Sequence, residues 1–374
     1  MKQIKTTIYY QTKTLFTNTG DVLINKSLLG ALRRYGTIRA NCSSEIPASF
    51  IDALGIREEE KVKSETELSF ILNILRNALK GRVFIVSGLG HICGGGNQRI
   101  VRNLIASSIF AFYRLLNVRI IRIGFSIGPV SRGLALSESL RGYFVSKYYV
   151  RDTKSLALCH AIGIKKAELC PDMSWLYEFG EKRQIQVGGG KTTILLSFRR
   201  RGFAKSVSGH AEDPIAEQVL NALSFLKSRL DLKIIVAYQV AEDALFCGYL
   251  AGLLRNNYEV EFIDKQMTLD DAREVYRKAV FTISNRLHSL LLSYKYGCVP
   301  VALVDKEENL KIVSTFEDCG LGELLINIGD DSSVLETSLE HIIDNKEELY
   351  HKVVAVEAQK QKEIIACLDS IFSV

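Results

Sequence analysis

The sequence predicts an α/β protein with two doubly wound parallel sheets, one in each half of the chain. Three observations predict this class. Apolar, strand-like stretches alternate with stretches whose apolar residues recur at helical spacing, which is typical of parallel sheets covered by helices on both faces. The chain has 374 residues, enough for two hydrophobic cores. A polar segment with three consecutive glycines, residues 178–192, interrupts the alternation and suits a linker.

The first half carries this pattern in helices and buried strands. A capping box from Ser64 to Glu67 marks the start of one helix, and glycine follows the end of two of them. Helices are predicted at residues 22–36, 64–81 and 99–116, and strands at residues 82–88 and 118–124. A further helix and strand lead to the sequence "YYVRD".

The second half repeats the same logic. Strands are predicted at residues 192–198, 233–238 and 259–264, with helices over residues 213–230, through residue 254 and after residue 268. The stretch "FTISNRLHSLLLSYKYGCVPVALV", residues 281–304, then gives a strand, a turn, a helix and another strand. The alternation therefore continues close to the end of the chain.

We predict three parts from this order of elements. Residues 1–180 form one Rossmann-like domain, residues 192–345 form a second, and residues 346–374 form a terminal helix. The two domains are expected to face each other across a cleft, which is the natural place for a ligand.

Composition and charge exclude several classes of protein. With 47% hydrophobic residues and five prolines, the chain is neither disordered nor of low complexity. Its formal net charge of +6, without a run of five like charges, suits an anionic substrate or a membrane surface better than nucleic acid. The eight cysteines show no zinc-ligand spacing, so we expect reduced, packed thiols. We find no transmembrane stretch and no signal peptide, and expect a cytoplasmic protein.

Arg286 and His288 are the most informative polar residues. They follow the predicted strand that ends in "FTIS", where a parallel sheet presents its carboxyl edge and the next helix presents unpaired N–H groups. An arginine there matches a phosphate or carboxylate, and a histidine two residues later can donate to the same anion. A surface ion pair for Arg286 and a cap or core position for His288 remain open as alternatives.

A second group of arginines supports the anion-binding hypothesis. Arg199, Arg200 and Arg201 leave the carboxyl end of the strand "TTILLSF". If both strands belong to one sheet, these arginines open onto the same edge as Arg286. A solvated basic turn is the alternative.

The first half offers weaker candidates. Asn18, Gly20 and Asp21 lie at a turn that starts a helix, where Asp21 on physical grounds is an N-cap. His91 lies in the glycine-rich loop "SGLGHICGGGNQ", which matches neither nucleotide-binding glycine motif. We interpret this loop as a backbone that lets a substrate approach closely.

Together, the motifs resemble the polysaccharide pyruvyl transferase family. "NTGD", "GFSIGP", "VRDTKSLALCHAIGI" with "CPDMS", "LLSFR" and above all "SNRLHSLLLSYKYGCVPVAL" occur in the order seen in that family, from residue 18 to residue 304. The resemblance implies the GT-B-like architecture of two Rossmann-like domains. The sequence departs from the family's pattern where "SGLGHI" precedes the glycine run.

The resemblance also implies an activity and its residues. Family members transfer the enolpyruvyl unit of phosphoenolpyruvate to a sugar of a surface polysaccharide, such as a capsule or exopolysaccharide, and form a pyruvate ketal. Arg199, Arg286, Leu287 and His288 match the donor-binding positions, with His288 as the expected acid. The amino-terminal domain would hold the sugar near Asn18, Gly20, Asp21 and His91, with Asp21 as a candidate base. No cofactor or metal is implied.

Two other functions remain open at this stage: a nucleotide-sugar glycosyltransferase of GT-B architecture, and a non-catalytic anion-binding protein. The expected partners are phosphoenolpyruvate and a sugar acceptor, with a lipid-linked oligosaccharide among the candidates, and no nucleic acid. The apolar, basic residues 105–122 are expected to be buried as helix and strand, with peripheral contact to a membrane as the alternative.

Overall fold

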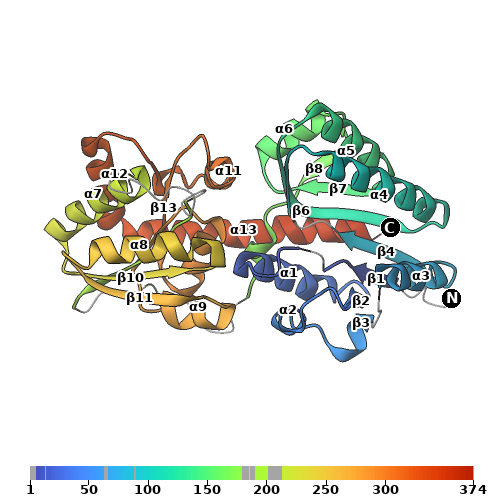
Figure 1. The fold of residues 1–374 in the computed structure, drawn as a ribbon, viewed down its shortest axis with the longest axis horizontal. Coiled ribbons are helices and arrows are strands. Elements are labelled where there is room, and N and C mark those ends of the chain that lie inside the picture. The colour runs from blue at the N-terminus through green and yellow to red at the C-terminus, as the bar shows by residue number, and fades with distance from the viewer. Residues whose placement is uncertain are drawn as a thin grey trace. The chain divides into compact units, whose positions relative to one another are not determined.

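The computed structural model describes residues 6–12, 14–62, 66–87, 90–178, 185, 190–200 and 213–373. The chain forms two compact units (Figure 1). The first contains residues 1–16, 21–178 and 360–374, and the second contains residues 17–20 and 179–359.

The first unit is built around a parallel sheet. Its strands are β1 (Thr6–Tyr10), β2 (Thr37–Asn41), β3 (Lys61–Val62), β4 (Arg82–Ser87), β5 (His91–Gly94), β6 (Arg119–Val130), β7 (Lys147–Val150) and β8 (Ala167–Leu169). Its helices are α1 (Thr19–Leu32), α2 (Ala48–Ala53), α3 (Glu67–Ala78), α4 (Asn97–Leu115), α5 (Arg132–Phe144) and α6 (Thr153–Ala161). The strand order is β3-β2-β1-β4-β6-β7-β8, and β5 pairs with β6.

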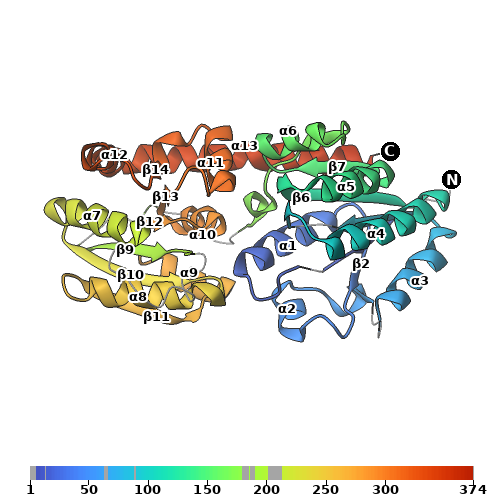
Figure 2. The ribbon, with the colours of Figure 1, turned by 45° about the horizontal axis from the view of Figure 1, so that its top comes forward.

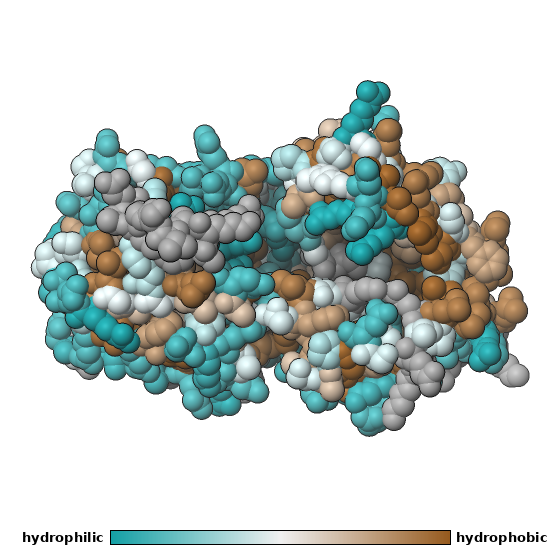
Figure 3. Space-filling model, in the orientation of Figure 1, coloured by the Kyte–Doolittle hydropathy of each residue, from teal (hydrophilic) through white to brown (hydrophobic). Residues whose placement is uncertain are grey.

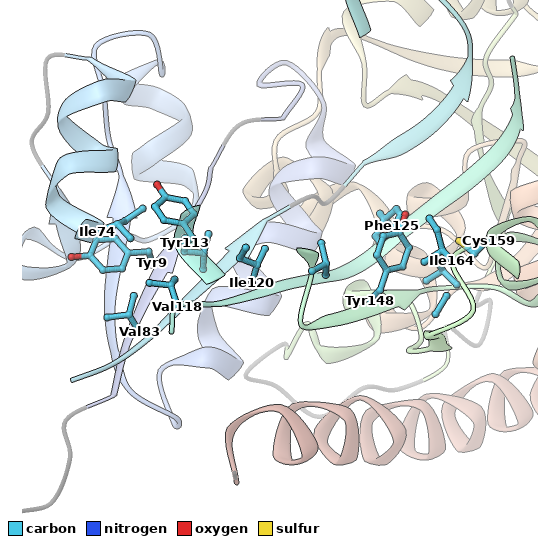
Figure 4. Close-up of a cluster of buried hydrophobic side chains, with 14 of the residues drawn as sticks. Tyr9, Ile74, Val83, Tyr113, Val118, Ile120, Phe125, Tyr148, Cys159 and Ile164 are labelled. Atoms are coloured by element: carbon cyan, nitrogen blue, oxygen red, sulfur yellow. The ribbon is translucent and has the colours of Figure 1, made fainter. Parts of the chain in front are cut away.

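The core of this unit lies between the sheet and its helices. Ile120 of β6 is fully buried, and Phe125 packs edge to face against Tyr148 of β7, with 5.0 Å between ring centroids. At the other end of the cluster, Tyr9 and Val83 come from β1 and β4 (Figure 4). The continuous apolar runs that predicted buried strands thus form the middle of the sheet.

The second unit is also a parallel sheet. Its elements are β9 (Thr192–Ser197), α7 (Pro214–Arg229), β10 (Leu232–Tyr238), α8 (Ala244–Leu254), β11 (Glu259–Gln266), α9 (Leu269–Tyr276), β12 (Phe281–Ser284), α10 (Leu287–Ser293), β13 (Val299–Val304), α11 (Leu310–Asp318), β14 (Leu325–Asn327) and α12 (Ser332–Asp344). The strand order is β11-β10-β9-β12-β13-β14. Figure 2 shows β9, β10 and β12 with helices above and below them in that view.

Two helices contribute residues to both units. α1 starts at Thr19, in the short segment 17–20 that belongs to the second unit, and continues in the first. The last helix, α13 (Lys346–Phe372), belongs to the second unit through residue 359 and to the first from residue 360. The division therefore differs in two places from the expected domains at 1–180, 192–345 and 346–374.

Several local expectations differ from the structure. α3 begins at Glu67 with Thr66 as its N-cap, whose hydroxyl accepts from the Ser69 backbone N–H at 3.3 Å. The expected cap Ser64, the arginine Arg201 and most of the linker 178–192 lie outside the described residues.

Other features agree with the sequence analysis. The eight cysteines are free thiols. Among the described helices, none combines the length and apolar character needed to cross a bilayer.

The apolar residues 105–122 are only partly buried. Ile120 and Ile121 lie in the interior of the sheet as expected, but α4 exposes Ile105, Phe112 and Leu115. The expectation of burial is confirmed only in part for this helix: Tyr113 is buried and Ile109 and Phe110 pack against the core, while the exposed residues lie on the outer face.

Candidate functional site

The candidate site lies at the carboxyl ends of β9 and β12 in the second unit. These strands are parallel neighbours, with Phe281 opposite Ile194 and Ser284 opposite Ser197. Arg199 and Arg286 each follow their strand by two residues. The prediction that the two strands share a sheet is therefore confirmed, and both arginines leave the same edge.

Asn285 joins the two strand ends. Its side-chain oxygen accepts from the Arg199 backbone N–H at 2.7 Å, and its amide nitrogen donates to the Arg199 carbonyl at 2.9 Å. Asn285 is only 7% exposed, and both bonds are partly buried. This one amide fixes the backbone of Arg199 next to that of Arg286. Sequence reasoning missed Asn285, although an amide directly after a strand is a signal for this role.

Arg286 occupies the N-cap position of α10. Its backbone N–H donates to the Ser284 hydroxyl at 2.9 Å, and its guanidinium Nη2 forms an ion pair with Asp243 Oδ2. The Nε of Arg286 is buried and has no hydrogen-bond partner within the described part of the chain. The guanidinium is therefore held from one side and keeps donor capacity for an anion.

Asp243 is the charged partner that the sequence did not reveal. It comes just before α8 and its side chain is 4% exposed. Burial raises the pKa of Asp243 above its usual range, while the positive charges of Arg286 and Arg199 act in the opposite direction. The site thus combines two arginines with one buried acid.

His288 packs against Gly20. A Cβ atom added at Gly20 would lie 2.8 Å from the Cγ and 3.0 Å from the Cβ of His288, and it would overlap Nδ1. Only glycine leaves room for the imidazole at this distance. Gly20 of "NTGD" and His288 of "RLH", which are far apart in the chain, therefore meet in the second unit.

Residues 17–20, which include Gly20, are hydrogen-bonded to residues at and just beyond the carboxyl ends of β10 and β11. Asn18 forms an antiparallel bridge with Val240, and the Thr19 hydroxyl donates to the Met267 carbonyl. The Gln266 side chain donates to the Thr17 carbonyl at 2.6 Å. Asn18 and Gly20, which the sequence analysis assigned to the amino-terminal domain, thus belong to the second unit.

The remaining predicted residues of the second unit have packing or structural partners. Leu287 is the first residue of α10 and is buried. Arg200 forms an ion pair with Asp213, the N-cap of α7, at 2.6 Å. Of the described arginines after β9, Arg199 is thus the one whose charge reaches Asp243.

Asp21 belongs to the first unit and holds a loop. Its carboxylate accepts from the Thr14 hydroxyl at 2.5 Å and from the Leu15 backbone N–H at 3.1 Å. Because Thr19 already begins α1, Asp21 is the third residue of the helix and the expected N-cap role is wrong. Its role as a base stays a prediction.

His91 belongs to the first unit as well. Its Nδ1 lies 2.9 Å from the Ser126 hydroxyl, and a Cβ added at Gly128 would lie 3.2 Å from its Nε2. The glycine-rich segment therefore forms the short strand β5 against β6, which places His91 beside the "SIGP" sequence. The acceptor role of His91 stays a prediction.

Several solved structures have a similar fold. A UDP-GlcNAc 2-epimerase from Methanocaldococcus jannaschii is 13% identical, with 90% of this chain and 92% of that chain covered and a TM-score of 0.54. An α,α-trehalose-phosphate synthase (UDP-forming) from Burkholderia vietnamiensis is 9% identical, with both chains fully covered and a TM-score of 0.55. At these identities the likeness shows the fold alone. A search of curated proteins found no match.

The two parallel-sheet units and these neighbours define a protein of the GT-B-like class. Within that class, the family model for polysaccharide pyruvyl transferase matches residues 18–306, which is more than half of the chain. The chain belongs to the polysaccharide pyruvyl transferase family. Family membership implies a transferase that works in polysaccharide biosynthesis and takes a sugar substrate.

Proposed function

We propose that this protein transfers the enolpyruvyl unit of phosphoenolpyruvate to a sugar of a surface polysaccharide or its lipid-linked precursor, and forms a pyruvate ketal. The observation that carries the proposal is the pair of arginines at the ends of neighbouring strands, with His288 packed beside them on Gly20. The donor has a phosphate and a carboxylate, and two arginines suit two anionic groups. A cytoplasmic location remains a prediction.

The proposed chemistry assigns a role to each group. A proton adds to the methylene carbon of phosphoenolpyruvate, and the resulting oxocarbenium-like centre is attacked by one sugar hydroxyl. Phosphate then leaves, a second hydroxyl closes the ring, and the two hydroxyl protons are released. His288 is the proposed acid, and general acid catalysis is typically worth about 10²- to 10⁴-fold in rate. No cofactor takes part in these steps.

Arg286 and Arg199 would hold the donor. Arginine forms bidentate bonds to phosphate and carboxylate, and the buried Nε of Arg286 has no hydrogen-bond partner among the described residues. The Asn285 amide keeps the two backbones at a fixed separation, so the donor would meet a preorganised site. Asn18 and Gly20, next to His288, are then proposed to contact the reacting end of the sugar.

Calorimetric titration of phosphoenolpyruvate tests the donor site. We expect Arg286→Ala to weaken binding at least about tenfold, because a hydrogen bond to a charged group is worth about 1.5–3 kcal/mol. Arg200→Ala is the matched control: Arg200 follows the neighbouring strand β9 but pairs with Asp213, so this variant should bind like the wild type. Near-UV circular dichroism checks the folding of both variants.

Two outcomes would contradict the proposal. If the wild type does not bind phosphoenolpyruvate even with candidate acceptor glycans present, but binds a nucleotide sugar, the glycosyltransferase alternative is favoured. The UDP-GlcNAc 2-epimerase reported above shares the fold, so UDP-GlcNAc is the first nucleotide sugar to test. Binding of phosphoenolpyruvate without phosphate release across many acceptors would favour a non-catalytic protein.

A further inference from the structure

The outer face of helices α4 and α5 in the first unit carries large apolar residues, while several polar residues lie on their inner face. α4 buries Asn103 and Ser107, and α5 buries Ser137 and Glu138. The large apolar residues exposed on α4 are Val101 (53%), Leu104 (44%), Ile105 (56%), Phe112 (49%) and Leu115 (82%), and those on α5 are Leu136 (66%), Leu140 (45%) and Tyr143 (76%). A surface helix usually exposes polar residues instead, so these outer faces are unusually apolar.

The inner polar residues have their own partners. Glu138 forms ion pairs with Arg122 and Arg141, and accepts hydrogen bonds from the Tyr148 hydroxyl at 2.9 Å and the Asn103 amide at 3.1 Å. This network joins α4, α5 and the sheet. The unit therefore assembles without using the outer apolar residues, which remain exposed.

These apolar residues form one surface. The Asn103 amide reaches both Glu138 and the Ser137 hydroxyl, so α4 and α5 lie side by side (Figures 1 and 2). Figure 3 shows hydrophobic residues gathered over both helices, in the upper right of that view. Exposed patches of this kind usually mark an interaction site. We call this set of eight exposed residues, with the arginines beside them, the α4–α5 outer surface.

All exposed charge on the two helices is positive. Arg99, Arg102 and Arg114 on α4 and Arg132 on α5 are exposed, and Glu138, the only acidic residue of either helix, is buried. A partner must therefore be apolar and anionic at once. We propose that the α4–α5 outer surface docks onto an anionic lipid bilayer, with the apolar side chains in the acyl boundary and the arginines at the headgroups.

A second copy of the chain fits this surface less well. In a two-fold contact the same surface faces itself, so arginines would meet arginines with no exposed carboxylate on either helix to pair with. A bilayer supplies acyl chains and negative headgroups over the whole area. The inference does not rest on pyruvyl transfer, although docking would bring the protein to a lipid-linked acceptor.

Vesicle flotation of the full-length protein tests this inference. We expect binding to vesicles of phosphatidylcholine mixed with phosphatidylglycerol, weaker binding at high salt, and little binding to pure phosphatidylcholine. The double variant Ile105→Ser/Leu136→Ser should lower the partition coefficient at least about tenfold, because each large side chain contributes substantially on burial. Arg102→Gln/Arg132→Gln should reduce the dependence on phosphatidylglycerol.

The matched control is Leu245→Ser/Val334→Ser in the second unit, where the two residues are 62% and 49% exposed. This control variant should bind the vesicles as strongly as the wild type. Thermal melts should show that the control, the Ile105→Ser/Leu136→Ser variant and the Arg102→Gln/Arg132→Gln variant are all folded. Absence of binding to the anionic vesicles, or equal loss in control and outer-surface variants, would overturn the inference. So would a dimer in light scattering that the Ile105→Ser/Leu136→Ser variant alone abolishes, since this would assign the surface to a second copy.

Discussion

The contact between Gly20 and His288 is the most sensitive point of the candidate site. A methyl group at position 20 would overlap the imidazole ring, so we expect Gly20→Ala to move His288. If His288 is the acid, kcat/KM for phosphate release should fall at least about tenfold, since general acid catalysis is worth about two to four orders of magnitude. Steady-state kinetics with phosphoenolpyruvate and an acceptor measure this loss.

Gly30→Ala provides the control for this variant. Gly30 lies in the same helix, α1, and nothing lies within 4 Å of a Cβ added there. We expect wild-type kinetics and a small gain in stability, up to about 1 kcal/mol, because alanine favours helix over glycine. Unchanged activity in Gly20→Ala would mean that the position of His288 does not matter for turnover.

Asp243 should make the free energy of unfolding fall as pH rises, which is the opposite of what a carboxylate with a lowered pKa does. Its pKa in the folded protein is raised above the ordinary value of 3.8, mainly because it is buried. Between 3.8 and the raised pKa, the folded state binds more protons than the unfolded state, so the free energy of unfolding falls as pH rises. The contribution of Asp243 is thus fully present below pH 3.8 and is lost above its folded pKa.

The isosteric variant Asp243→Asn isolates this effect. Urea unfolding of both proteins across this pH range should show the wild type losing stability relative to Asp243→Asn as pH rises. The difference should become constant above the folded pKa of Asp243. A difference that rises with pH would show that the ion pair with Arg286 outweighs burial and lowers the pKa instead.

The sequence revealed part of the site and could not reveal the rest. Arg199 and Arg286 were predictable because each follows a strand, and parallel strands end at one edge of a sheet. The role of Asp243 was not predictable, because its ion pair with Arg286 depends on how α8 packs and not on any local sequence pattern. The placement of Asn18 and Gly20 in the second unit depends on hydrogen bonds to Val240 and Met267, which no spacing encodes.

At the scale of elements, the strands and helices of the second unit follow the predicted order. The strands that precede Arg199 and Arg286 are buried over all of β12 and over the last four residues of β9, so their sequences are apolar runs bounded by polar turns. This signal is strong because a parallel sheet has no solvent-facing side. The same signal identified β4 and β6 in the first unit.

Two elements of the first unit could not be predicted from local patterns. β5 lies within a glycine-rich segment that reads as a loop, and it becomes a strand because β6 extends far enough to pair with it. α4 was correctly predicted as a helix, but the choice of its buried face was not. That choice depends on the bonds of Asn103 to α5, which are tertiary contacts.

At the scale of the whole molecule, α13 stabilises both units through different residues. In the second unit, Glu357 forms a buried ion pair with Lys295, and the Tyr350 hydroxyl donates to the Tyr294 carbonyl at 3.1 Å. In the first unit, Phe372 stacks on Tyr35 with 4.8 Å between ring centroids. The end of the chain is therefore part of the core of the unit in which the chain begins.

This arrangement predicts that the two units lose stability separately. Phe372 is 8% exposed and also packs on Phe84, with ring centroids 4.7 Å apart, so Phe372→Ala should destabilise the first unit by about 3–5 kcal/mol. Phe246→Ala, which removes a buried ring from α8, is the reciprocal variant for the second unit. Hydrogen exchange should show lower protection of β1, β4 and β6 in the first variant and of β9, β10 and β12 in the second, because each unit has its own core. If either variant lowers protection equally in both sheets, the chain unfolds as one cooperative body and the two units are not independent in stability.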